Sequence, residues 1–83
     1  MAKYTGLALV TGVSNPDIEA QVLATLAPFT IQILDKQSMD IRDRYFLAIH
    51  FSLDPAHQRA ITQDLEEMAK RLKIDIAIDY QSE

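Results

Sequence analysis

One order of sequence patterns occurs twice in this chain: a strand-like segment, an Asx-Pro pair, a helix-like segment and another strand-like segment. The two pairs are Asn15-Pro16 and Asp54-Pro55. Asn and Asp are favoured N-cap residues, and proline suits the first helical position because its missing N–H would have no intrahelical partner there. Each pair therefore predicts that a helix begins directly after a strand.

Four segments have the period of a β-strand, at residues 4–11, 30–41, 45–53 and 74–80. The third is the clearest, because Tyr45 to Leu53 alternates without a break. Its other face would consist of Phe46, Ala48, His50 and Ser52. In the second segment, Ile31, Ile33, Met39 and Ile41 are expected to share a face, and a bulge or bend is expected in the polar stretch 35–38.

Helical spacing follows each Asx-Pro pair, and Pro28 should end the first helix. The apolar residues of the two helices are Ile18, Val22, Leu23 and Leu26, and then Ile61, Leu65, Met68 and Leu72. The resulting order, βαββαβ, predicts the α+β class: a ferredoxin-like sandwich with two helices on one face of a four-stranded antiparallel sheet. The second strand should lie at an edge, where it could pair with another chain, and the alternative dimer contact is the helical face.

Composition limits the remaining choices. Eighty-three residues make one domain, expected to span 1–83, and a domain this small often gains stability by oligomerisation. We expect a homodimer, because the absence of cysteine excludes disulfides and thiolate metal sites. A net charge of -4 without a basic patch argues against nucleic acid, and no apolar run is long enough for a membrane span. We expect a cytoplasmic protein without cofactor or metal.

Residues suited to catalysis are sparse, so we expect this chain itself to be non-catalytic. No nucleophile elbow, HExxH motif or phosphate-binding loop is present. Asp75 and Asp79 would stand about 13 Å apart on a strand, too far to form one acid–base pair, and are expected to face solvent. His50 is expected to be a partly exposed sheet residue, the alternative being a ligand or dimer contact. His57 is expected to be solvated.

The sequence resembles an ACT domain over nearly its whole length. The resemblance rests on LALVTGVSNPDIEAQVLATLAP, then ILDKQSMDIRDRYFLAIHF, then a charged helix and LKIDIAIDY. It is most similar to the ACT module that precedes the catalytic domain of some bacterial phosphoserine phosphatases. The resemblance implies a regulatory, dimerising module of serine biosynthesis that binds an amino-acid effector, with serine as the first candidate. The chain would then be the N-terminal part of a longer enzyme or a free-standing module.

The resemblance also implies where an effector would bind, between the loop after the first strand and the second strand of a partner. The facing segment is Leu34 to Met39, and the residues placed at the loop are Thr11, Gly12, Val13, Ser14, Asn15, Asp17 and Ile18. Asp17 stands where the family motif has glycine. Its charge and bulk would oppose an effector carboxylate at the helix N-terminus. Asn15 and Pro16 also explain the turn without any ligand, so a free-standing interaction module is the alternative function.

Overall fold

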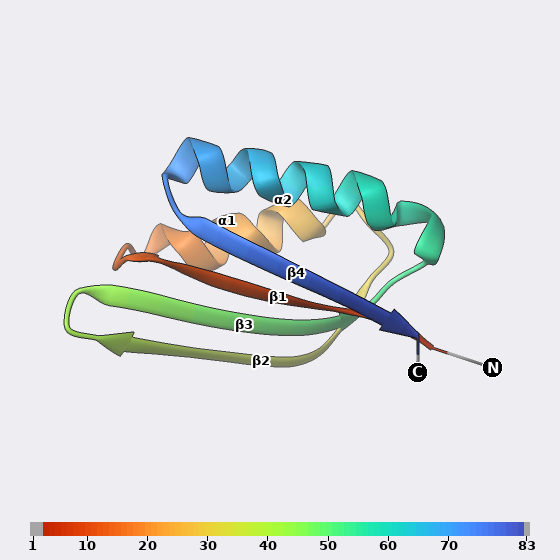
Figure 1. Ribbon diagram of the computed structural model, residues 1–83, viewed down its shortest axis with the longest axis horizontal. Coiled ribbons are helices and arrows are strands. Elements are labelled where there is room, and N and C mark those ends of the chain that lie inside the picture. The colour runs from red at the N-terminus through yellow and green to blue at the C-terminus, as the bar shows by residue number, and fades with distance from the viewer. Residues whose placement is uncertain (1–2, 83) are drawn as a thin grey trace.

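The computed structural model describes residues 3–82, whose elements follow the predicted βαββαβ order (Figure 1). A short 3₁₀ turn precedes the second helix. The elements are β1 (Tyr4–Val13), α1 (Asp17–Leu26), β2 (Gln32–Ile41), β3 (Arg44–Ser52), the 3₁₀ turn (Pro55–His57), α2 (Gln58–Leu72) and β4 (Asp75–Ser82).

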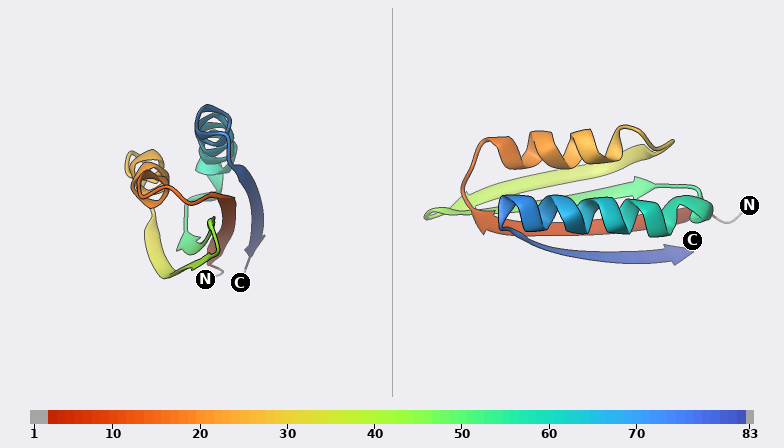
Figure 2. Two further views of the ribbon diagram at one scale, coloured as in Figure 1. Left: turned by 90° about the vertical axis from the view of Figure 1, so that its left-hand side faces the viewer. Right: turned by 90° about the horizontal axis from the view of Figure 1, so that it is seen from above.

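The strands form one antiparallel sheet in the order β2-β3-β1-β4. Both helices lie on the same side of it, and the other side has no covering element within residues 3–82 (Figure 2). The predicted ferredoxin-like sandwich is therefore confirmed, and so is the edge position of the second strand. β4 forms the opposite edge.

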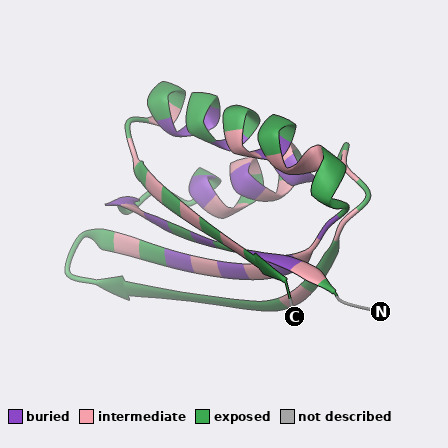
Figure 3. Ribbon diagram, turned by 45° about the vertical axis from the view of Figure 1, so that its right-hand side comes forward, coloured by how far each residue is buried: buried purple, intermediate pink, exposed green. Residues whose placement is uncertain are grey.

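The core lies between the helices and the sheet (Figure 3). β3 supplies alternate residues to it, as its uninterrupted period predicts, and the helices supply residues at helical spacing. The most completely buried large side chains are Phe51, Ile18, Leu26, Ile49, Ile61, Leu65, Met68 and Val22.

The two ends of β2 face opposite sides of the sheet. Ile33 pairs with Phe51, which points toward the helices, whereas Met39 pairs with Phe46, which points away from them. A register shift between Ile33 and Asp35 separates the two parts. The extra residue reverses the alternation, so the predicted common face of residues 31, 33, 39 and 41 was wrong. The expected bulge exists, just before the polar stretch.

The helix starts agree with the Asx-Pro prediction to within a few residues. The side chain of Asn15 accepts a hydrogen bond from the Asp17 N–H at 2.9 Å, although α1 begins one residue after Pro16. The Asp54 side chain accepts from the Ala56 N–H at 2.9 Å, and the 3₁₀ turn intervenes before α2. Lys73 follows the last residue of α2 as its C-cap, in the left-handed conformation with φ 59° and ψ 46°.

The histidines differ in their surroundings. His50 is partly exposed, as predicted. The prediction of a solvated His57 was wrong, because its side chain is half-buried beside Phe29, with 6.0 Å between the ring centroids. Its Nδ1 atom is buried without a hydrogen-bond partner among the described residues. His57 is the last residue of the 3₁₀ turn, and its ring lies against Phe29 in the connection between α1 and β2.

Candidate functional site

The loop between β1 and α1 is attached to the β2–β3 hairpin through Ser14. The Ser14 N–H donates to the Asp43 carbonyl oxygen at 2.7 Å, and its hydroxyl donates to Asp40 Oδ1 at 2.8 Å. Both donor groups of Ser14 are therefore used within the chain. The hairpin thus determines where the start of α1 lies.

The N-terminus of α1 is already capped by its own loop. Besides accepting from the Asp17 N–H, Asn15 accepts from the Ile18 N–H at 3.2 Å through its carbonyl oxygen. Pro16 has no N–H, and Asp17 and Glu19 place negative charge in the first turn. A helix N-terminus attracts anions through free N–H groups and its positive dipole end. Here an anion would compete with Asn15 and with two carboxylates.

The other predicted effector residues do not gather at this loop tip. Thr11 accepts a hydrogen bond from Arg44 Nη2 at 3.3 Å, and Val13 is exposed beyond it on the sheet. Gly12 is buried against Ile74, and a Cβ added to it would lie 2.5 Å from Ile74 Cγ2. Ile18 is buried in the core. Ser14, Asn15 and Asp17 are therefore the exposed members of the predicted set at the tip.

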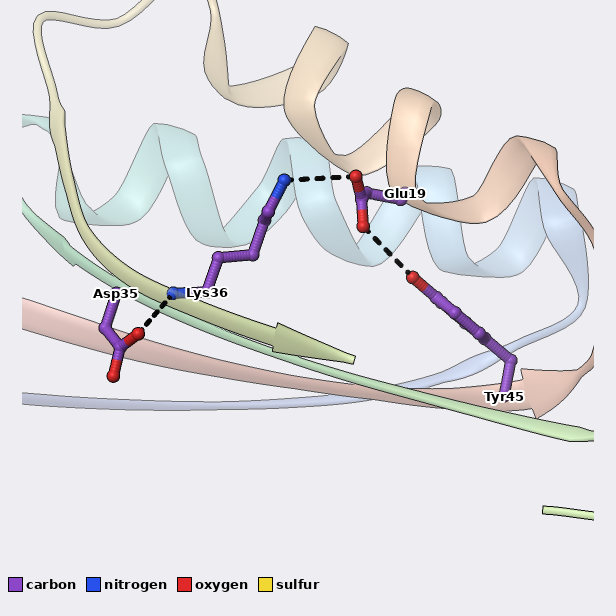
Figure 4. Close-up of polar contacts among 4 residues, drawn as sticks. All are labelled: Glu19, Asp35, Lys36 and Tyr45. Atoms are coloured by element: carbon purple, nitrogen blue, oxygen red, sulfur yellow. Dashed lines mark hydrogen bonds and ion pairs between the residues drawn. The ribbon is translucent and has the colours of Figure 1, made fainter. Parts of the chain in front are cut away.

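The facing segment of β2 is joined to α1 by a polar network (Figure 4). Lys36 Nζ lies 3.1 Å from Glu19 Oε2, and the Tyr45 hydroxyl donates to Glu19 Oε1 at 3.3 Å. Burial raises the pKa of the Tyr45 hydroxyl, a hydrogen bond with Ser38 lowers it, and the Glu19 carboxylate raises it further. Glu19 is thus held by two neighbours, while the outer backbone edge of β2 has no neighbouring strand in the described fold.

A hollow of about 550 Å³ lies on the side of the sheet away from the helices. It includes Thr11 and residues 37–39, so it joins one end of the predicted loop to the predicted facing segment of the same chain. Sequence reasoning missed this hollow, although the apolar outward positions of β1 were visible in the alternation. Its lining residues are Leu9, Val10, Thr11, Gln37, Ser38, Met39, Phe46, Leu47, Ala48, Asp75, Ile76 and Ala77.

The groups described in residues 3–82 are suited to binding another molecule. No group of three or more His, Cys, Asp or Glu side chains in that range is arranged to hold a metal ion. None of the described helices has the length and apolar character needed to cross a membrane. The loop tip provides carboxylates and hydrogen-bonding groups, and the hollow provides an apolar surface.

Comparison with known proteins identifies the family. The family model of the ACT domain matches residues 7–79, and the chain belongs to this family. No curated protein matches the sequence.

Solved structures show the same fold at low sequence identity. A formyltetrahydrofolate deformylase from Burkholderia mallei is 18% identical with a TM-score of 0.83, over 92% of this chain and 28% of that one. A putative glycine cleavage system transcriptional repressor is 14% identical with a TM-score of 0.85, over 100% and 48%. The regulatory subunit of aspartate kinase from Thermus thermophilus is 16% identical with a TM-score of 0.66, over 96% and 51%. The chain thus spans about half or less of these proteins.

Proposed function

We propose that this ACT domain is a non-catalytic regulatory and dimerisation module that binds an amino-acid effector between the β1–α1 loop of one copy and β2 of another. Serine is the first candidate effector, and a phosphoserine phosphatase is the proposed parent enzyme. The family match over residues 7–79 supports the regulatory role. Two of the structural neighbours are described as a repressor and a regulatory subunit.

The observation that most favours this arrangement is that β2 is exposed and lies at an edge of the sheet. Nine of its ten residues are exposed, and within residues 3–82 only β3 pairs with it. An edge strand with free N–H and C=O groups can pair with the same strand of a second copy. The loop tip around Ser14 is fastened to the hairpin that ends β2, so pairing there would bring a partner strand close to the loop.

The effector would regulate by favouring one arrangement of the two copies. Its influence is limited to the difference between its affinities for the two states. Because Asn15 already caps the helix and Asp17 repels a carboxylate, we expect binding to be weak. Removing a repulsive charge in a first helical turn changes the free energy by about 0.3–1 kcal/mol, or roughly two- to fivefold in affinity.

Isothermal titration calorimetry against the twenty amino acids, with serine first, tests the proposal. We expect heat of binding for at least one amino acid and tighter binding to Asp17→Gly. Asp17→Asn is the matched control, because it removes the charge and keeps the size, and so separates repulsion from steric hindrance. Flat titrations at millimolar ligand for all three proteins would rule out the effector.

A free-standing interaction module without a small-molecule ligand is the second candidate. It is favoured by the loop itself, because the donors of Ser14, Asp17 and Ile18 are satisfied within the chain. A dimer that forms normally but binds no amino acid would support this candidate. The parent enzyme is tested separately by the coding sequence downstream of Glu83, where a phosphoserine phosphatase requires a DxDxT motif.

A further inference from the structure

The hollow on the side of the sheet away from the helices is lined by two rows of side chains that cross all four strands. Neighbours within each row are paired in the strand register. The first row is Gln37, Ala48, Leu9 and Ala77. The second row is Met39, Phe46, Thr11 and Asp75. Because alanines lie on both sides of Leu9, the first row is lower than the second, which contains longer side chains.

The hollow has the size and the lining of a small-molecule site. Its volume of about 550 Å³ lies within the range of about 300–1,000 Å³ that is typical of ligand pockets. Such pockets are mainly apolar, with a few polar groups that orient the ligand. Leu9, Met39 and Phe46 are exposed large apolar residues of the domain, and all three line the hollow. Its polar groups lie at its two ends, on β2 and where β1 meets β4.

The charge of the hollow comes from Asp75, because none of the other described residues that line it is charged. Asp75 is exposed, and within residues 3–82 it forms no ion pair. Strand pairing places two further carboxylates on the same side of the sheet, since Asp79 pairs with Leu7 and Asp35 pairs with His50. The hollow therefore lies in a region of negative charge, and the Asp75 carboxylate can receive a positive group.

Arg44 supplies an opposing charge on this side of the sheet. Its Nη2 atom donates to Thr11 Oγ1 at 3.3 Å, but the residue lies outside the lining of the hollow. Even if His50 is counted as a second cation, the three carboxylates leave this side of the sheet negative. Complementary charge favours the correct partner and repels others. A cationic ligand is therefore favoured over a carboxylate, a phosphate group of nucleic acid or an anionic membrane.

We propose that this hollow binds a small organic amine with an apolar body. The body lies over the low first row, in contact with Leu9 and the two alanines, and the ammonium group lies at the Asp75 carboxylate. The site is separate from the proposed effector site, which uses the β1–α1 loop and the edge of β2. It is also compatible with edge pairing, because the hollow uses side chains of the sheet face whereas pairing uses the backbone of β2.

A nuclear magnetic resonance titration of the chain with phenylbutylamine tests the ligand class. Phenylbutanol and phenylbutanoate are the matched probes, because they keep the apolar body and replace the positive charge by none and by a negative one. We expect saturable shifts for the amine at about millimolar concentration, confined to amides of residues 9–11, 37–39, 46–48 and 75–77. The amine should bind roughly tenfold more tightly than the carboxylate, and added salt should reduce this difference.

Two pairs of variants test the residues. Asp75→Asn should weaken amine binding about two- to fivefold and leave phenylbutanol binding unchanged. Asp79→Asn is its control, because it removes the same charge from the same strand and side of the sheet but outside the lining, and its effect should be smaller. Ala77→Leu fills the first row and should abolish binding of all three probes. Ala60→Leu, at an exposed position of α2, adds the same bulk elsewhere and should change nothing.

Several results would overturn the proposal. It is wrong if the amine causes no localised shifts at millimolar concentration, or if all three probes bind equally and Asp75→Asn has no effect. It is also wrong if amine binding disappears as the protein concentration rises, since a second copy of the chain would then cover the hollow. Circular dichroism checks that each variant is folded.

The same titrations separate this site from the proposed function. Serine has no apolar body, so its shifts should lie at residues 14–17 and respond to Asp17→Gly but not to Asp75→Asn. Amine binding at the hollow together with flat serine titrations would keep this site and remove serine as the effector. Serine binding at the loop without amine binding would keep the proposed function and refute this site.

Discussion

Replacing Gly12 by alanine should destabilise the domain, because the new methyl group has no room. A Cβ at this position would lie 2.5 Å from Ile74 Cγ2 and 3.1 Å from Ile74 Cβ. The first of these distances is below any normal carbon–carbon contact. The branched Ile74 side chain cannot turn both atoms away, since its Cβ moves only with the backbone between α2 and β4.

The magnitude follows from two opposing terms. Forcing an extra methyl group into a packed site costs about 1–3 kcal/mol. Replacing glycine in a strand regains about 0.5–1 kcal/mol, because the unfolded chain loses freedom. The difference between these terms is about 0–2.5 kcal/mol, and the 2.5 Å contact places the cost in the upper part of its range, so we expect Gly12→Ala to lower the free energy of unfolding by about 1–2 kcal/mol. For a domain of this size, that corresponds to a melting temperature lower by roughly 4–16 °C.

A double-mutant cycle with urea unfolding as the assay identifies the cause. Ile74→Ala removes the Cγ2 atom and leaves only the 3.1 Å contact with the Cβ atom, so in that background Gly12→Ala should cost clearly less than in the wild type. Ile74→Val is the matched control, because valine keeps both Cγ positions, and the full penalty should persist. If Gly12→Ala costs the same in the alanine and valine backgrounds, close packing against Ile74 is not the reason for the glycine.

Three further changes test other features. Asn15→Ala should lower the free energy of unfolding by about 1 kcal/mol through loss of the cap, and Asn15→Asp should retain most of it, as measured in urea. Lys73→Gly should raise that free energy by about 0.5–1 kcal/mol in the same assay, because Lys73 has φ 59°, a left-handed conformation that glycine adopts without strain and lysine does not. Lys73→Ala should not raise it, because alanine is strained there as well. Burial raises the pKa of the Tyr80 hydroxyl above its usual value of 10.0, so the folded state holds this proton more tightly than the unfolded state. Its contribution to stability is therefore complete below pH 10 and declines as pH rises further, and thermal melts of Tyr80→Phe should show a weaker alkaline decline.

The fold could be predicted from the sequence because its local signals agree. The unbroken alternation from Tyr45 to Leu53 marks a strand with one buried face, and Leu47, Ile49 and Phe51 are indeed buried. The two Asx-Pro pairs mark the places where strands end and helices begin. With strands and helices in a fixed order and short connections, few arrangements remain that cover the apolar face.

The face assignment of β2 could not be predicted, because it depends on a pairing between strands. The shift between Ile33 and Asp35 is visible only against β3, and nothing in the local sequence says which residue is extra. Likewise, the position of His57 depends on a contact with Phe29, which is distant in sequence. The polar stretch after Leu34 indicated an irregular strand. It did not indicate that Met39 would lie on the side of the sheet away from the helices.

The candidate site was located by resemblance and is explained by hydrogen bonds that a sequence does not reveal. Asn15 was predictable as a cap, because its type and its place before proline are sufficient. The attachment of Ser14 to Asp40 and to the backbone of Asp43 was not, since the partners are 26 and more positions away in the chain. This attachment matters for function, because it makes the loop a fixed part of the hairpin.

The bulge in β2 decides which side of the sheet the end of the strand faces. An unbroken alternation from Ile33 would direct Met39 and Ile41 toward the helices. The extra residue places both side chains on the side of the sheet away from the helices, beside Phe46 and Arg44, while β2 remains an edge. A bulge also twists an edge strand and disturbs its regular pairing, which is how natural sheets discourage edge association. The same irregularity therefore makes the part of β2 around residues 33–35 less suited to pairing with another strand. It also adds apolar side chains to the side of the sheet away from the helices. On this reasoning the edge near the hairpin, at residues 37–41, is the part of β2 that remains suited to pairing, and it is also the part to which Ser14 anchors the loop.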